Sequence, residues 1–183
     1  MKFQQARNFR KGRTKKVDLV GIHTMECPEQ LDTAEKVAGW FAGIAAPPAS
    51  AHYCVDVDSV VQCVKEEDVA WHAKGGDVNA RSIGIEMAGY AKQTPEQWAD
   101  DYSTKMLDRT ANLVADICAR HNLPIKFVDA AGLLAGERGI TTHREVTKAY
   151  KVVGGHVDPG PNFPMYDFVI KVLSYQVYPD EIS

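Results

Sequence analysis

Short apolar runs rich in β-branched residues alternate along this chain with amphipathic segments of helical spacing. Residues 17–24 (VDLVGIHT) and 82–88 (SIGIEMA) are apolar on both faces, which is typical of strands buried within a sheet. Residues 33–44 and 95–121 instead carry apolar side chains at three- and four-residue spacing. This alternation predicts an α/β sheet protein.

Capping signals set the expected ends of the helices. Asp32 is a candidate N-cap for the helix at 33–44. Thr94 precedes a proline and is followed three residues later by Gln97, so one helix is expected to begin there and to end near His121. A brief helical turn is expected within 129–139, and a last helix after Pro164.

Residues 51–57 and 60–65 predict a β-hairpin with a tight turn at Asp58-Ser59. In that register Cys54 faces Cys63, and a cross-strand disulfide is geometrically conceivable. A protein made in the cytosol would normally keep both thiols reduced. The four cysteines show no CxxC spacing, so a cysteine zinc site is not indicated.

The charge distribution separates the N-terminus from the rest of the chain. Seven of the 21 Lys and Arg residues precede the first acidic residue, Asp18, which leaves 14 basic against 24 acidic residues after it. We therefore expect a basic N-terminal arm over residues 1–16 and one domain over 17–183. The arm could contact anionic wall polymers, a membrane surface or nucleic acid, and a solvated tail without a partner is an equal alternative.

Neither a transmembrane helix nor a signal peptide is expected. The longest apolar runs are short and interrupted by charge, and no apolar core follows the basic N-terminal residues. The expectation is synthesis in the cytoplasm without a signal peptide.

Three histidines and one aspartate stand at expected element ends or in loops: His23, His143, His156 and Asp158. Two histidines and one carboxylate can form a catalytic zinc site, which takes three protein ligands and keeps the fourth position for water. His23, His143 and the pair His156 and Asp158 are far apart in sequence, so their spacing alone leaves the ligand set open.

Six short motifs follow one another in the chain: GIHT with His23, SAHY from Ser50, AWHA around His72, SIGIE ending in Glu86, TTH with His143, and HVDPGPNFP from His156. In this order they resemble the successive signatures of type 2 N-acetylmuramoyl-L-alanine amidases. The likeness extends from about Val17 to Val172. It implies the peptidoglycan-recognition-protein fold, a mixed central β-sheet flanked by α-helices, shared with amidase-type phage endolysins.

The resemblance assigns roles to particular residues. His23, His143 and Asp158 fall on the family's Zn²⁺-ligand positions, and Glu86 falls on the strand carboxylate that assists the attacking water. Burial should raise the pKa of a strand glutamate and a nearby zinc ion should lower it, which together suit a general base. The alternative for Glu86 is a core glutamate paired with Lys or Arg.

His156 departs from the family pattern, because many relatives have a lysine there that stabilises the oxyanion. An imidazolium can donate the same charge-assisted hydrogen bond, but histidine is only partly protonated near neutral pH. The alternatives are a loop histidine, or a zinc ligand in place of Asp158. Some relatives also have a catalytic tyrosine at the position of Ala51, and that contribution is absent here.

Trp71, His72 and Asn79 match segments that line the family's substrate groove, and simple packing of Trp71 is nearly as good an interpretation. The implied function is zinc-dependent hydrolysis of the amide between N-acetylmuramic acid and L-alanine in peptidoglycan, by a phage endolysin that reaches the wall after holin-type release. A cytosolic amidase that recycles muropeptides and a non-catalytic peptidoglycan-binding module are the alternatives. A monomer without a nucleic-acid partner or an organic cofactor is expected.

Overall fold

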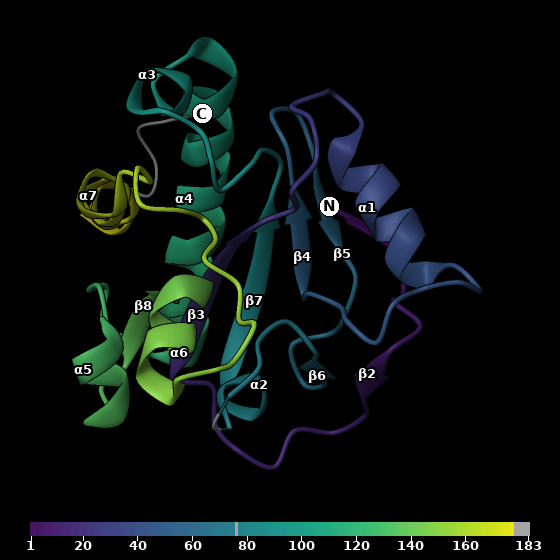
Figure 1. Cartoon of the computed structure of the whole chain (residues 1–183), viewed down its shortest axis with the longest axis vertical. Helices are drawn as coiled ribbons and strands as arrows, with labels where there is room; N and C mark the ends of the chain where they lie inside the picture. Colours follow the sequence, from purple (N-terminus) through teal and green to yellow (C-terminus); the bar gives the residue numbers. More distant parts are fainter. Residues whose placement is uncertain (76, 178–183) are drawn as a thin grey trace.

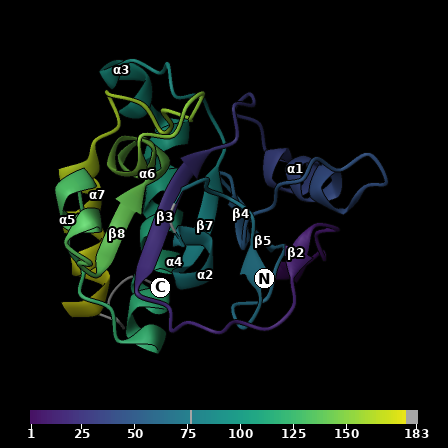
Figure 2. The same cartoon turned by 60° about the horizontal axis from the view of Figure 1, so that its bottom comes forward.

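The computed structural model describes residues 1–75 and 77–177 and is built around a six-stranded sheet (Figure 1). The strand order is β1-β5-β4-β7-β3-β8, with bounds Lys2–Phe3, Val60–Gln62, Tyr53–Val55, Ser82–Met87, Leu19–Thr24 and Gly139–Thr142. The neighbours β4, β7, β3 and β8 run parallel, whereas β5 is antiparallel to β4. Figure 2 shows β8, β3 and β7 side by side. The mixed sheet flanked by helices confirms the expected fold class.

Seven helices lie among the described residues. They are α1 (Thr33–Ala42), α2 (Val78–Arg81), α3 (Pro95–Trp98), α4 (Asp101–His121), α5 (Ala130–Leu134), α6 (His143–Tyr150) and α7 (Met165–Val177). None of them is long and apolar enough to cross a membrane.

Alternation along the two central strands gives the sheet one apolar face and one functional face. Val20 and Ile22 of β3 pack with Ile83 and Ile85 of β7 against apolar residues of α4 and α7 in the main core. The intervening residues of both strands point to the opposite face. The functional face therefore carries His23 of β3 and its registered neighbour on β7, Glu86.

Helices α1 and α6 flank the functional face (Figure 1). Helix α1 packs its buried residues Ala34, Val37, Ala38 and Phe41 with Cys54, Val61 and Cys63 of the hairpin. Helix α6 contributes Val146 and Ala149 to a smaller cluster with Leu19 and α5. The C-terminal ends of β3 and β7 lie between these two clusters, which is where open α/β sheets place their sites.

The single helix expected from Thr94 to His121 is two helices. The predicted capping box at Thr94 and Gln97 is present, but it opens only α3. Asp100 then acts as a second N-cap by accepting a hydrogen bond from the Ser103 N–H, and α4 begins there. The side chain of Asp100 thus competes with helix continuation.

The hairpin has a different register from the one expected. Val55 pairs with Val60 and Cys54 with Val61, so Cys54 does not face Cys63. The reason is the Asp56 carboxylate, which accepts hydrogen bonds from the backbone N–H groups of Asp58 and Ser59 and closes a wider turn. The two cysteine sulfurs are 3.7 Å apart and both thiols are free.

Residues 1–16 follow the surface of the domain and pair with it. Strand β1 extends the sheet beside β5, and β2 (Phe9–Arg10) pairs with β6 (Val69–Ala70). The Arg13 guanidinium donates to the backbone carbonyls of Glu66, Asp68 and Ala80 at 2.7–3.0 Å. This basic segment is therefore tied to the domain by backbone pairing and one partly buried arginine.

Candidate metal centre and active site

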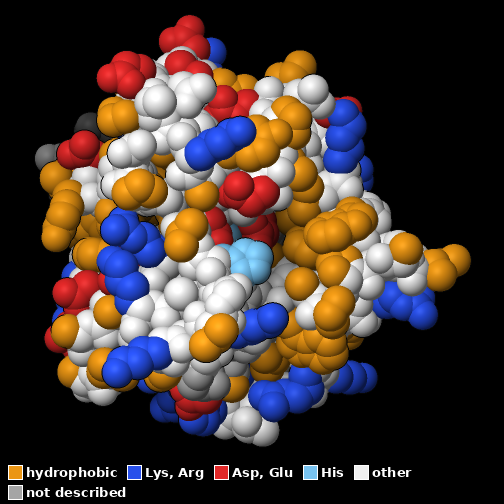
Figure 3. Space-filling view, in the orientation of Figure 1, with side chains coloured by type: hydrophobic (Ala, Val, Ile, Leu, Met, Phe, Trp, Pro, Cys, Tyr) orange, Lys and Arg blue, Asp and Glu red, His pale blue; other side chains and the backbone are white. Residues whose placement is uncertain are grey.

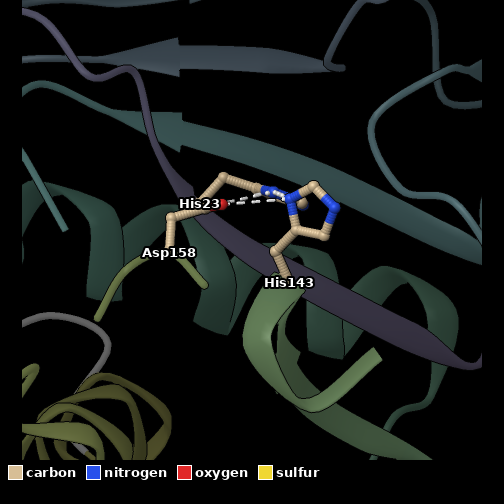
Figure 4. A group of neighbouring side chains, drawn as sticks. All are labelled: His23, His143 and Asp158. Carbon is tan, nitrogen blue, oxygen red and sulfur yellow. Dashed lines mark hydrogen bonds and ion pairs between the residues drawn. The ribbon is translucent and has the colours of Figure 1, made fainter. Parts of the chain in front are cut away.

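Three elements that are distant in sequence place His23, His143 and Asp158 together (Figure 4). His23 lies near the C-terminal end of β3, and His143 is the first residue of α6, directly after β8. Asp158 lies in the loop between α6 and α7, and its backbone carbonyl accepts a hydrogen bond from the Arg144 N–H at 2.9 Å. That bond holds the loop against the start of α6.

The donor atoms of the three side chains converge on one point. His23 Nδ1 is 3.1 Å from His143 Nδ1 and 3.2 Å from Asp158 Oδ2, and His143 Nδ1 is 3.1 Å from Asp158 Oδ1. A tetrahedral zinc ion with bonds of about 2.0–2.2 Å requires ligand atoms roughly 3.3 Å apart. The three side chains therefore fit a zinc ion with little movement, and all three are buried.

The charge states of the cluster suit a cation. Burial lowers the pKa of His143, although the hydrogen bond to Asp158 opposes that shift. Burial would raise the pKa of Asp158, but hydrogen bonds from His143 and His23 outweigh it and hold this pKa below its ordinary value. A neutral imidazole beside an ionised carboxylate is the state in which both can bind a metal.

Glu86 lies on β7 opposite His23 in the strand register. Burial, followed by the nearby charges of Asp158 and Glu26, raises the pKa of Glu86 well above its ordinary value. Its Oε2 atom is buried, and no donor among residues 1–75 and 77–177 reaches it. The alternative of a core glutamate paired with Lys or Arg does not occur in the part of the chain that the structure describes.

His156 stands at the open side of the cluster. Its ring stacks on His143 with centroids 4.7 Å apart, and its Nδ1 is 3.8 Å from Asp158 Oδ1. The His156 side chain is 64% exposed, whereas that of Asp158 is 5% exposed. Of these two residues Asp158 faces the two histidine donors directly, and His156 borders the same point from solvent.

The three residues expected to contact substrate lie in different surroundings. Trp71 is 38% exposed, and it borders a surface cavity of about 350 Å³ together with Asn79. The Asn79 side-chain oxygen accepts from the backbone N–H groups of His72 and Ala73 and so holds this loop. The His72 side chain is buried below His23, and it forms hydrogen bonds with His23 and Ser82. His72 is therefore not placed for direct contact with a substrate.

Sequence reasoning missed the short helix that presents His143. Thr142 caps this helix by accepting from the Glu145 N–H, and Thr-His-Arg-Glu is a capping-box pattern that could have revealed it. It also missed Ser82, the partner of His72, for which the sequence carries no comparable signal.

Figure 3 shows the functional face from outside. A histidine side chain is exposed near the middle of this face, beside Asp and Glu side chains, and hydrophobic side chains gather toward α1. An anionic and imidazole-rich centre next to an apolar margin is consistent with a polar substrate held on a partly apolar surface.

Two buried histidines and a buried aspartate that could hold a metal ion thus lie beside a strand glutamate on a mixed sheet. A family model described as N-acetylmuramoyl-L-alanine amidase matches residues 13–161. The chain therefore belongs to the N-acetylmuramoyl-L-alanine amidase family, whose members cleave the amide between the sugar and the peptide of peptidoglycan. This confirms the family and the amidase activity expected from the motifs.

Solved structures show the same fold. A Staphylococcus aureus hydrolase AmiA in complex with its ligand is similar with a TM-score of 0.71 and 16% identity, over 96% of this chain and 84% of that chain. A mutant endolysin from Bacillus subtilis is similar with a TM-score of 0.66 and 19% identity, covering 93% and 97% of the two chains. The N-acetylmuramoyl-L-alanine amidase LysC from Clostridium intestinale is similar with a TM-score of 0.54 and 17% identity, over 94% of this chain and 98% of that chain. No curated protein matches the chain significantly.

Proposed function

We propose that this amidase is zinc-dependent, with His23, His143 and Asp158 as the metal ligands and Glu86 as the general base. The observation that carries the proposal is the convergence of three buried side chains: His23 Nδ1 lies 3.1 Å from His143 Nδ1, and the two Asp158 oxygens lie 3.2 Å and 3.1 Å from His23 Nδ1 and His143 Nδ1 respectively. Zinc would supply a Lewis acid that polarises the scissile carbonyl and lowers the pKa of water.

Glu86 is suited to move the proton in this reaction. Its raised pKa keeps the carboxylate basic, and the charge of a bound cation would bring that pKa back toward neutrality. Glu86 would accept a proton from the attacking water and return it to the nitrogen of the leaving L-alanine. One carboxylate thereby serves first as base and then as acid.

His156 would stabilise the negative charge that develops on the carbonyl oxygen of the substrate. Its ring borders the point where the three donor atoms meet, and its exposure leaves it free to reach a bound substrate. As an imidazolium it donates a charge-assisted hydrogen bond. Trp71 and Asn79, which border the neighbouring cavity, are proposed to contact the sugar or peptide.

The biological setting that we propose is a phage endolysin acting on intact wall after holin-type release. Similarity to structures described as a Bacillus subtilis endolysin and as the catalytic domain of XlyA supports this setting. A muropeptide-recycling amidase would have the same site but would act on soluble fragments. Similarity to a structure described as an AmpD derivative supports this second setting equally.

The test of the function is a digest of purified peptidoglycan by the zinc-loaded protein. We expect new N-terminal L-alanine without new reducing sugar ends, loss of this activity after chelation, and recovery with zinc. Activity that survives complete metal removal would contradict zinc dependence. Comparing intact sacculi with soluble muropeptides then decides the setting, because an endolysin must act on sacculi.

A further inference from the structure

His72 connects the proposed metal ligand His23 to the interior of the protein. Its Nδ1 is 2.9 Å from His23 Nε2, and its Nε2 is 2.9 Å from Ser82 Oγ. The Ser82 hydroxyl in turn donates to the Val78 carbonyl at 2.6 Å. Four groups thus form one buried chain of hydrogen bonds that starts at the outer nitrogen of His23.

The direction of these bonds follows from the metal site. His23 Nδ1 faces His143 and Asp158, so a metal held there leaves the proton on His23 Nε2. His23 Nε2–H then donates to His72 Nδ1, which must be an unprotonated acceptor. A neutral His72 carries its proton on Nε2 and donates it to Ser82, whose hydroxyl has the Val78 carbonyl as its acceptor. With a metal bound at His23 Nδ1, only one placement of protons, on His23 Nε2, His72 Nε2 and Ser82 Oγ, gives every group in the chain a hydrogen-bond partner.

Two glycines make room for the His72 ring on the functional face. Gly21 and Gly84 are paired in the strand register, each two residues before a functional side chain, His23 and Glu86. A Cβ atom on Gly84 would lie 2.4 Å from the His72 ring, and one on Gly21 would lie 3.2 Å from it. The His72 ring therefore packs directly on the backbone of the two strands beside His23. Any residue larger than glycine at these positions would occupy the space of the ring.

We propose that His72 is a positioning residue that fixes the proton and the orientation of His23 through the chain His23–His72–Ser82–Val78. This inference rests on the proposed metal site. A partner of this kind orients a metal ligand and raises its basicity, and removing it typically costs about 10- to 100-fold in metal affinity. His72 acts through His23 and does not touch the reacting atoms.

The primary test is zinc affinity, measured by chelator competition on metal-free protein. We expect His72→Leu to bind zinc about 10- to 100-fold more weakly, because it keeps a similar volume but offers no acceptor. His72→Asn should stay within about threefold of wild type, since its side-chain oxygen lies near the place of Nδ1. The visible spectrum of the cobalt-loaded protein should change in His72→Leu and return in His72→Asn.

His52→Leu is the matched control. His52 is a second fully buried histidine whose ring centroid is 6.0 Å from that of His72, and its hydrogen bonds go to Gly84, Arg13 and Asp68 instead of to the metal ligands. Its loss should lower stability but leave zinc affinity within about threefold of wild type. Equal losses of affinity in His52→Leu and His72→Leu would show that both act only through general stability and would overturn the inference.

A measurement on unmodified protein avoids dependence on any variant's folding. Two-bond nitrogen–proton correlation spectra of ¹⁵N-histidine-labelled, zinc-loaded protein should show His72 as the Nε2–H tautomer. An Nδ1–H tautomer or an imidazolium at His72 would overturn the inference. Failure of the wild-type protein to take up zinc would instead refute the proposed function on which it rests.

Discussion

The two sides of the candidate metal centre are built differently. The floor consists of His23 and Glu86 on adjacent central strands, with His72 buried beside His23 over Gly21 and Gly84. The wall is the loop after α6, where Asp158 is buried but Val153 is fully exposed and His156 largely so. Under the proposed function this difference predicts that the buried residues His23, His143 and Asp158 hold the zinc ion, while the exposed His156 affects turnover of the substrate.

The largest effect should come from the three proposed metal ligands, which lie on the floor, on the wall and at the start of α6. His23→Ala, His143→Ala and Asp158→Ala should each lose zinc and reduce amidase activity to background, because a three-point site needs every ligand. Metal content by atomic emission and activity on peptidoglycan are measured on the same samples. His121→Ala, a histidine bound to Glu66 away from the site, should retain both. Full zinc occupancy in any of the three alanine variants would remove that residue from the ligand set.

A substitution of Glu86, the floor residue that is not a proposed metal ligand, should reduce amidase turnover without reducing zinc binding. Glu86→Gln should keep zinc and lose activity by about 100- to 10,000-fold, because the near-isosteric amide cannot accept the proton of water. Turnover and zinc content are compared with those of wild type. Near-normal turnover would show that Glu86 is structural.

Substitution of His156 on the wall should also reduce turnover without loss of zinc, but by less. His156→Ala should retain zinc and lose about 100- to 1,000-fold in turnover, the usual cost of one oxyanion donor. His156→Lys should recover most of this loss, because an ammonium supplies the same charge. Loss of zinc in His156→Ala would make the residue a ligand, and a loss below tenfold would make it a bystander.

The smallest effect on zinc binding and turnover should come from a hydrogen-bond network outside the site. A substitution there should change the stability of the protein alone. Glu66 accepts hydrogen bonds from Tyr53, Arg120 and His121. Burial opposes ionisation, but these bonds outweigh it and lower the pKa of Glu66 to about 2. Glu66→Gln should cost about 1–3 kcal/mol in the free energy of unfolding at neutral pH, with zinc affinity unchanged.

The pH dependence of that cost has a definite sign. Because the folded-state pKa of Glu66 is depressed from 4.5 to about 2, its contribution is complete above about pH 4.5 and is lost as the pH falls toward 2. Urea unfolding of wild type and Glu66→Gln at several pH values should therefore converge in acid. A difference that is constant across this range would contradict the ionic origin of the stabilisation.

The sequence predicted the parts of the molecule whose pattern is local. The apolar runs of β3 and β7 required buried strands, and the motif order indicated the family. The hairpin register could not be predicted, because it depends on the Asp56 carboxylate closing the turn. The break between α3 and α4 was missed because Asp100 interrupts an otherwise continuous helical pattern.

The site was predictable to the same extent. The motifs named His23, His143 and Asp158, but only the fold shows that their donor atoms meet. The place of His72 could not be derived, because a motif does not tell which way a ring points. The sequence shows a glycine two residues before His23 and another two residues before Glu86. That Gly21 and Gly84 together make room for the His72 ring follows only from the pairing of the two strands.

The most direct test of the account is a crystal of the zinc-loaded protein, with anomalous diffraction recorded above and below the zinc absorption edge. We expect one difference peak on the functional face, about 2.0–2.2 Å from His23 Nδ1, His143 Nδ1 and one Asp158 oxygen. A peak coordinated by His156 in place of Asp158, or the absence of a peak at this cluster in protein that hydrolyses peptidoglycan, would contradict it.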